Sequence, residues 1–228
     1  IICASTGFSE WSINSLDYWK GTYSDTKYVI ASPLRWNKGD WAECAFIVGT
    51  TGGIMSQDEE IQNWAQGERS STSDKFFPLI GDLGSWGAAA TLGSIYLGGC
   101  ITHNTKLKRT SLLATKSVIA SGVIIVIFKV LIGRSRPYKE EGACVYSPFN
   151  IHSKNQSFPS GHTSTAFSIV GCISEEYKNP LISVVMYGTA ILVGLSRIHD
   201  NKHWASDVFV GSVIGISVGK TIAKLHLR

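Results

Sequence analysis

The sequence of 228 residues is 44% hydrophobic and 17% charged, and its formal net charge is +4. These values exclude a disordered chain, which is poorer in apolar residues and richer in charge. The length suits one domain with a modest extension. The sequence has no lysine-rich tail and no basic stripe interleaved with aromatic residues, so nucleic acid is not an expected partner.

The five cysteines are odd in number, widely spaced and form no C-x-x-C pair. That pattern argues against a cysteine zinc site and against a disulfide framework. The sequence starts with Ile-Ile-Cys instead of methionine, so we expect that it has been trimmed, and a signal peptide or membrane anchor would be the segment removed.

Residues 1–40 are polar and rich in aromatic side chains without a sustained period. We expect an irregular extension here, with at most one short helix, packed on a helical domain that spans residues 41–228. The stretch 57–83 is also polar and loop-like, with a short helix expected at DEEIQNWAQ.

Six segments have the length and apolar character of helices, namely 41–56, 84–101, 111–133, 161–177, 180–196 and 204–224. The β-branched run VIIVIFKVLI within the third also resembles a strand. Its segment exceeds twenty residues, whereas strands rarely exceed ten, so length favours a helix. The sequence therefore predicts an all-α fold, a six-helix bundle.

Several of these segments approach the twenty residues that cross a bilayer. Small residues, as in GAAATLGS, allow helices to pack closely in lipid or in a tight soluble bundle. The first segment is polar for a membrane span, and lysines lie inside the third. The bundle is thus predicted to be either membrane-embedded or membrane-associated, and a soluble bundle also fits.

Three polar clusters interrupt these apolar segments, and the first is KVLIGRSRP. Lys129 and Arg136 are seven residues apart, so a helical path places both on one face. Pro137 disfavours helical geometry at Arg136, which predicts a helix that ends there with its arginines at the mouth of a site. The competing interpretation is a charged helix end solvated by water.

The second cluster is FPSGHTSTAF. Ser160 suits the N-cap of the following helix, and Gly161 lets the backbone approach a ligand closely. The unpaired amides of the first turn would form an anion site with His162 beside it. A plain serine cap with an incidental histidine explains the same residues.

The third cluster, SRIHDNKHWASD, contains two histidines four residues apart and an acid, which resembles a zinc-protease helix. That chemistry needs a glutamate base and a third ligand. Here the acid is Asp200, which is shorter than glutamate, and Lys202 adds positive charge beside His203. Zinc is therefore disfavoured.

A second interpretation of this cluster accounts for more of its residues. Asp207, four residues after His203, can accept a hydrogen bond from one imidazole nitrogen and leave the other free as a nucleophile. Arg197 can supply a forked pair of donors to an anion. His199 has no role in this arrangement.

Together the clusters provide cations, a helix N-terminus, two histidines and an aspartate. This set suits a tetrahedral dianion, because cations and amides neutralise the charge that develops on the phosphoryl oxygens during transfer. One histidine would attack in line while the other protonates the leaving oxygen. Lysine and arginine supply the positive charge, so neither a metal nor another cofactor is expected.

The clusters resemble the signature of the type 2 phosphatidic acid phosphatase superfamily, which includes bacterial class A acid phosphatases and vanadium haloperoxidases. That signature reads K-x6-R-P, then P-S-G-H, then S-R-x5-H-x3-D. Every defining position is present here, in order, between residues 129 and 207.

The resemblance implies a role for each matched residue. His203 would be the nucleophile that forms a phosphohistidine, and Asp207 would orient it. His162 would be the general acid for the leaving group. The phosphoryl oxygens would be held by Lys129, Arg136, Ser160, Gly161 and Arg197. Outside the signature, Arg134 is interpreted as an auxiliary substrate contact and His199 as a residue that packs or lines the site mouth.

The function expected from this resemblance is metal-independent hydrolysis of a phosphate monoester or diphosphate. A phosphorylated lipid is the favoured substrate, with phosphatidic acid, phosphatidylglycerophosphate, an isoprenyl diphosphate and a lipid A phosphate as candidates. The expected location is the cell envelope, in the membrane or the periplasm, with the site facing the periplasm or exterior. A homo-oligomer is compatible with the sequence.

Three alternatives are a soluble periplasmic acid phosphatase acting on small phosphoesters, a vanadate-dependent haloperoxidase, and an anion-binding membrane bundle with a relic site. Haloperoxidases resemble this chain only in the motifs and are usually much longer. The intact pair His203 and Asp207, together with His162, argues against a relic.

Overall fold

The computed structural model describes residues 12–227, where the regular elements are helices and the β contact between Arg134 and Tyr146 is an isolated bridge. Its nine α-helices are α1 (Leu16–Ile30), α2 (Lys38–Met55), α3 (Asp58–Gly67), α4 (Ser73–Asp82), α5 (Trp86–Ile101), α6 (Thr105–Ile132), α7 (Gly161–Tyr177), α8 (Pro180–His199) and α9 (Ala205–His226). The predicted all-α class is confirmed, and each of the six predicted segments forms a helix. The count of six is too low, because α1, α3 and α4 are additional.

The helix α1 corrects the expectation of an irregular extension as far as residues 16–30 are concerned. Tyr18 and Val29 are buried on one side of this helix, while Trp19 and Tyr23 are exposed on the other. Aromatic residues on both faces hide the helical period from the sequence. The part of the predicted extension before residue 12 lies outside the described residues.

Two helices also replace the predicted loop at 57–83. Three acids occupy the first turn of α3, where the helix dipole favours negative charge, so the short helix expected there is confirmed. The helix α4 contains Pro78 in its interior, a residue that normally ends a helix. That proline is why the sequence did not predict α4.

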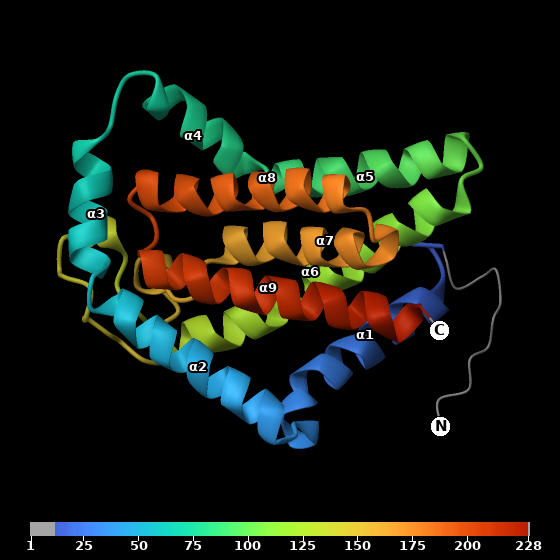
Figure 1. Ribbon diagram of the computed structural model, residues 1–228, viewed down its shortest axis with the longest axis horizontal. Coiled ribbons are helices and arrows are strands. Elements are labelled where there is room, and N and C mark those ends of the chain that lie inside the picture. Colours follow the sequence, from blue (N-terminus) through green and yellow to red (C-terminus); the bar gives the residue numbers. More distant parts are fainter. Residues whose placement is uncertain (1–11, 228) are drawn as a thin grey trace.

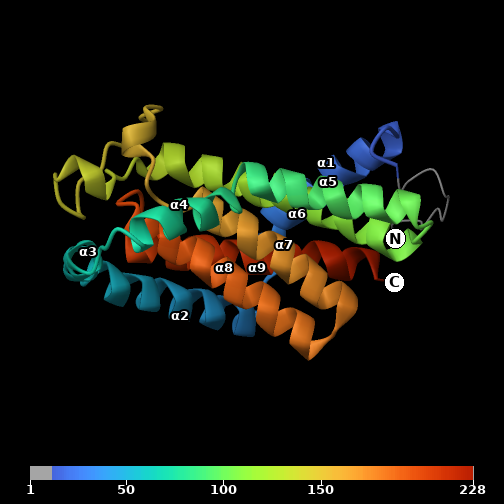
Figure 2. The same ribbon diagram turned by 90° about the horizontal axis from the view of Figure 1, so that it is seen from above.

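The helices α6 to α9 run side by side in alternating directions (Figure 1). As a result the end of α6, the start of α7, the end of α8 and the start of α9 meet at one end of the bundle, beside α3. Seen from above, α2 lies on one side of α7, α8 and α9, and α5 and α6 lie on the other (Figure 2).

The helices α7 and α9 pack closely because α9 carries a glycine at every fourth position toward α7. We call Gly211, Gly215 and Gly219 the glycine seam. A Cβ atom on these residues would lie 2.6, 2.5 and 2.3 Å from the carbonyl oxygens of Ser160, Ser164 and Ser168. Only glycine permits backbones to approach so closely.

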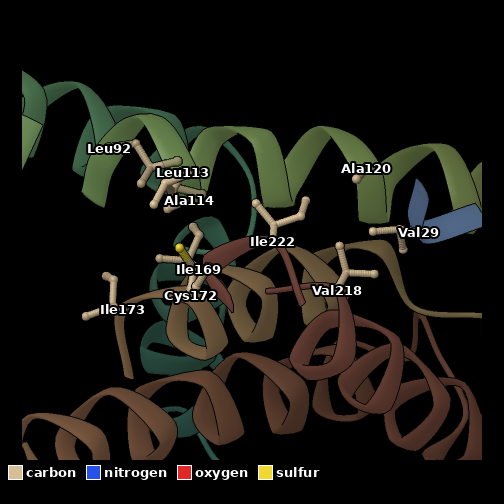
Figure 3. Packing of buried hydrophobic residues seen from close by; sticks show 12 residues of the cluster. Val29, Leu92, Leu113, Ala114, Ala120, Ile169, Cys172, Ile173, Val218 and Ile222 are labelled. Atoms are coloured by element: carbon tan, nitrogen blue, oxygen red, sulfur yellow. The ribbon is translucent and has the colours of Figure 1, made fainter. Parts of the chain in front are cut away.

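The main apolar core lies between α6, α7 and α9, with contributions from α1 and α5 (Figure 3). Leu113 of α6, Cys172 of α7 and Ile222 of α9 are completely buried within it. The core thus holds together the helices whose ends carry the three polar clusters.

By length and composition, the helices α6, α8 and α9 could each cross a bilayer. Large apolar side chains on the outside of α8 are exposed, such as Leu181 at 74% and Val184 at 71%. Apolar surface of this kind belongs in lipid. We conclude that the chain is a membrane protein.

Candidate active site

The end of the bundle that brings four helix ends together also holds every residue of the three polar clusters. The first cluster lies at the end of α6, the second at the start of α7, and the third across the loop between α8 and α9. The backbone N–H of Ser160 donates to the carbonyl oxygen of Asp207 at 2.9 Å. This bond joins the second cluster directly to the third.

The first cluster departs from its prediction because α6 ends four residues before Arg136. Gly133 adopts a left-handed conformation with φ of 62° and closes the helix, since a residue with a side chain would be strained there. Lys129 and Arg136 therefore do not share a helical face. They still converge, because both donate to the carbonyl oxygen of Gln156, at 2.5 and 3.4 Å.

Lys129 and Arg136 keep their positive charge available to a ligand. Neither forms an ion pair with a carboxylate in the part of the chain that the structure describes. Besides Gln156, Arg136 contacts the carbonyl oxygen of Ser153 at 2.9 Å. Two cations held only by neutral carbonyl groups form a natural binding place for an anion.

Ser160 occupies the N-cap position of α7 as predicted, but its side chain makes no capping hydrogen bond. Its hydroxyl instead accepts a hydrogen bond from Thr163 Oγ1 at 2.9 Å. Gly161 and His162 follow in the first turn, and both line a cavity of about 290 Å³ together with Lys129. The wall of this cavity continues into apolar side chains of α6.

His162 is neutral in the unoccupied protein. Burial, and after it the positive charges of the neighbouring Arg197 and Lys202, together lower the pKa of its imidazole to about 4. A bound dianion would have the opposite effect on the pKa, because negative charge favours the protonated imidazole.

Arg197, the cation of the third cluster, is held by an acid that the sequence interpretation assigned to a metal motif. Its Nη2 lies 2.5 Å from Asp200 Oδ2, and its Nε donates to Ser196 Oγ at 3.1 Å. Gly81 of α4 packs directly against the guanidinium group. Arg197 is therefore fixed in position, with part of its charge already neutralised.

His203 is almost completely buried, at 3% exposure. Its Nδ1 lies 3.5 Å from Asp207 Oδ2, which is longer than a normal hydrogen bond, and this nitrogen has no hydrogen-bond partner among the described residues. Burial lowers the pKa of His203 to about 3, against the opposing effect of Asp207. The imidazole is consequently neutral at pH 7, the form in which a nitrogen is nucleophilic.

Asp207 is fixed by three closer partners. The backbone N–H of Trp204 donates to Oδ2 at 2.9 Å, and the hydroxyl of Ser157 donates to the same oxygen at 2.5 Å. Arg134 Nη1 donates to Oδ1 at 2.7 Å. The sequence indicated Asp207 but gave no sign of the residues that hold it.

Arg134 is not placed as a substrate contact, which corrects the interpretation made from sequence. It is completely buried and forms ion pairs with Asp58 and Asp207, each at 2.7 Å. Asp58, from the first turn of α3, was missed. It lies in a run of three acids, and nothing in the sequence distinguishes it from its neighbours.

The two histidines of HDNKH contact different partners. His199 Nε2 lies 3.1 Å from Ser73 Oγ, and its ring stacks at 4.5 Å on Phe77 of α4, whereas His203 faces Asp207. Among residues 12–227, no three His, Cys, Asp or Glu side chains are grouped as metal ligands.

Comparison with known proteins agrees with this geometry. The sequence profile of the PAP2 superfamily matches residues 111–228, just over half of the chain. The chain therefore belongs to the PAP2 superfamily.

Individual relatives and structures show how far the likeness extends. A lipid A 1-phosphatase of Porphyromonas gingivalis is 48% identical over 66 residues, which are 28% of this chain and 15% of that protein. The crystal structure of LpxE from Aquifex aeolicus matches with a TM-score of 0.57 and 25% identity, over 73% of this chain and 94% of that one.

A second crystal structure supports the fold. The transmembrane PAP2 type phosphatidylglycerolphosphate phosphatase of Bacillus subtilis matches with a TM-score of 0.64 and 22% identity, over 81% of this chain and 96% of that one. The chain spans less than half the length of the curated relatives that it matches first.

Proposed function

We propose that this protein is a PAP2-type lipid phosphatase that hydrolyses a phosphate monoester or diphosphate of a membrane lipid through a phosphohistidine. The observation that carries the proposal is the buried, neutral His203 in front of Asp207, at the end of the bundle where Lys129, Arg136 and Arg197 converge. A neutral imidazole beside cations, of which Lys129 and Arg136 form no ion pair with a carboxylate of the described residues, suits attack on a phosphoryl group.

In the first step the Nε2 of His203 attacks phosphorus while the bond to the leaving oxygen breaks. His162 gives its proton to that oxygen, so the leaving group departs as an alcohol or a phosphate. The cations, together with Ser160 and the N–H of Gly161, hold the phosphoryl oxygens. Because this charge comes from side chains, the mechanism does not depend on a metal ion.

In the second step water attacks the phosphorus of the phosphohistidine. The now neutral His162 takes a proton from that water, the bond between nitrogen and phosphorus breaks, and inorganic phosphate leaves. Asp207 supports the positive charge that His203 carries in the intermediate, as an acid supports the histidine of a catalytic triad.

A lipid is the favoured substrate because three helices whose ends carry the proposed site residues are long and apolar enough to cross a bilayer. Relatives that bear the names lipid A 1-phosphatase and lipid phosphate phosphatase support this choice. They also make lipid A phosphate and phosphatidic acid the first compounds to test. The same helices argue against the alternative of a soluble acid phosphatase.

We further propose that the site faces the periplasm or exterior. The opposite end of the bundle carries Lys106, Lys108 and Arg109 at the start of α6 and Lys224 at the end of α9. Cytoplasmic loops of membrane proteins are enriched in such residues. Accessibility of Cys144, beside the site, and Cys100, at the other end, to an impermeant thiol reagent in intact cells would test this orientation.

The decisive experiment is a phosphate-release screen with the purified protein in detergent–lipid micelles. The substrates are lipid A phosphate, phosphatidic acid, phosphatidylglycerophosphate, an isoprenyl diphosphate and a water-soluble phosphoester. Release from one or more lipids, but little from the soluble ester, is expected. Release from the soluble ester alone would favour an acid phosphatase, and bromide oxidation with vanadate but no phosphate release would favour a haloperoxidase.

A further inference from the structure

We propose that Asp58 and Arg134 are positioning residues for phosphoryl transfer, which hold Asp207 and act on His203 through it. This inference rests on the proposed function, since it assigns residues to the same site. Neither residue belongs to the signature that identified the site.

The guanidinium group of Arg134 joins three segments of the chain. Its Nε donates to the carbonyl oxygen of Ala143 at 2.9 Å, and its Nη1 donates to Ser206 Oγ and Asp207 Oδ1, both at 2.7 Å. The Nη2 donates to Asp58 Oδ2 at 2.7 Å. All three nitrogens are engaged and the side chain is fully buried, so a substrate cannot reach it.

Asp58 is equally enclosed, with no exposed surface. Its Oδ1 accepts a hydrogen bond from the backbone N–H of Ser206 at 2.9 Å, and the Ser206 hydroxyl donates to its Oδ2. Asp58 therefore holds the first turn of α9 through hydrogen bonds from Ser206, the residue before Asp207. Its neighbour Glu59 accepts from the N–H of Ala143 at 2.8 Å, so α3 clamps the loop after α6 as well.

The arrangement fixes the direction in which the Asp207 carboxylate faces. Arg134 takes Oδ1, which leaves Oδ2 as the oxygen nearest to His203 Nδ1. Rotation of the carboxylate would break a charged hydrogen bond in a site without water contact, where such bonds are strong. His203 thus meets a carboxylate of fixed orientation.

The arrangement also sets the charge behind His203. The three side chains Asp58, Arg134 and Asp207 together carry one net negative charge. Without Asp58, Arg134 alone would cancel the charge of Asp207, and nothing would support a positively charged His203. Without Arg134, two buried carboxylates would share Ser206 with no cation between them, and repulsion would favour protonation of one. Asp58 and Arg134 are therefore needed together.

The test compares phosphate release by full-length Asp58→Asn and by unaltered protein in the same micelles. Asn has nearly the size of Asp, but it removes the negative charge and replaces one acceptor oxygen with an N–H₂ donor, so it also breaks one of the hydrogen bonds that Asp58 accepts. We expect kcat to fall about 10- to 100-fold with KM within about twofold, the usual scale for residues that orient a catalytic group. An unchanged kcat would overturn the proposal.

A double-variant comparison asks whether Asp58 acts through Asp207. If it does, adding Asp58→Asn to Asp207→Asn should lower kcat by less than about a further twofold, because the Asp207 carboxylate that Asp58 orients is already lost. If the loss of kcat in the double variant equalled the product of the two single losses, Asp58 would act independently of Asp207, and the proposal would be overturned.

The chain offers a matched control in Asp25 of α1. This partly buried acid also bridges partners on other helices, Lys116 at 3.0 Å and His226 at 2.8 Å, but at the opposite end of the bundle. Asp25→Asn should lower the unfolding temperature and leave kcat within about twofold. An equal loss of kcat in this variant would mean that the effect of Asp58→Asn is general destabilisation.

Two further measurements keep the proposal testable. Ser206→Ala removes the hydroxyl between Arg134 and Asp58, and this milder change can be used if Asp58→Asn fails to fold. Its kcat should fall about three- to tenfold. An unchanged kcat would count against a positioning role for Asp58 and Arg134. Vanadate binding by calorimetry needs no turnover. Vanadate that bonds to His203 should bind Asp58→Asn at least about tenfold more weakly, while inorganic phosphate, held by the cations, should bind equally well.

These measurements separate the two proposals. If the unaltered protein releases no phosphate from any lipid but its vanadate affinity depends on Asp58, the lipid phosphatase assignment fails and the positioning role stands. If phosphate is released and neither kcat nor vanadate affinity responds to Asp58→Asn, the positioning role fails alone. If the unaltered protein binds no vanadate and releases no phosphate, both fail.

Discussion

Arg197 Nη2 lies 2.5 Å from Asp200 Oδ2, so one of the three cations proposed to bind phosphate already has an acidic partner inside the same motif. Substrate phosphate must compete with this carboxylate for the guanidinium group. Asp200 thereby holds Arg197 in place and limits how tightly the site retains its anionic product.

Asp200→Asn should consequently bind inorganic phosphate more tightly. Removal of one negative charge beside Arg197 is expected to lower the inhibition constant of phosphate about three- to tenfold. The measurement is product inhibition of lipid hydrolysis. Asp74→Asn is the control, because this acid pairs with Arg69 at 2.8 Å. An inhibition constant that stays the same or rises would show that Asp200 mainly positions Arg197.

His203→Ala should lose at least about 10⁴-fold in kcat, the scale seen when a nucleophile is removed. The variant should still unfold cooperatively. A radiolabelled phosphoprotein, stable to alkali and labile to acid, should form with the unaltered protein and not with the variant. His199→Ala, which removes a ring packed on Phe77, should retain activity within about threefold. Turnover by His203→Ala would contradict the assignment of the nucleophile.

The pH dependence should reveal His162 as the acid. Its pKa is about 4 in the unoccupied protein, so kcat/KM, which reports the free enzyme, should fall as pH rises through that value. The bound dianion raises the pKa, so the fall in kcat should occur at a higher pH. His162→Asn should abolish the fall in kcat at the higher pH. This substitution should also reduce the hydrolysis of a p-nitrophenyl ester less than that of the lipid, because the p-nitrophenol leaving group needs no proton. If kcat and kcat/KM fell at the same pH, His162 would not be the general acid.

Chelation should leave activity unchanged, because side-chain cations supply the charge that neutralises the phosphoryl group. The assay is lipid hydrolysis after dialysis against EDTA, compared with the untreated protein. Loss of activity that added zinc restores would mean that a metal takes part, and His199 and His203 would then need to be reconsidered as ligands.

The glycine seam should be sensitive to a single methyl group. Gly215→Ala would place a Cβ atom 2.5 Å from the carbonyl oxygen of Ser164, and such overpacking costs about 1–3 kcal/mol. A lower unfolding temperature in detergent is expected. Gly188→Ala in α8, where no atom lies within 4 Å of the added Cβ, is the control and should be neutral or slightly stabilising. Equal changes in unfolding temperature for the two variants would mean that helix propensity, and not close packing at the glycine seam, determines the effect.

The sequence alone was enough to nominate the candidate site residues with fixed spacing, whose roles are proposals. Arg197, His203 and Asp207 are recognisable because they lie at set intervals around one loop. It could not identify the residues that support them. Asp58 lies far away in the chain among other acids, and only the folded α3 brings it to Arg134.

Arg134 and Arg136 illustrate a second limit. Both occur in the same short basic stretch, and sequence gives no means to tell which is buried. The left-handed turn at Gly133 decides this, because it ends α6 and directs Arg134 into the protein and Arg136 toward the carbonyl oxygens of Ser153 and Gln156. The aromatic residues of α1 and Pro78 of α4 limited the fold prediction in a similar way, since each hides a helix that tertiary packing stabilises.

The glycine seam also bears on when the protein becomes active. His203 lies just before α9 and Asp207 lies in its first turn, and the N–H of Ser160 reaches Asp207 only when α9 lies against α7. A chain that ends before α9 would therefore keep Lys129 and Arg136 but would lack the proposed nucleophile. Under the proposed mechanism, such a chain would have no hydrolytic activity until α9 docks against α7.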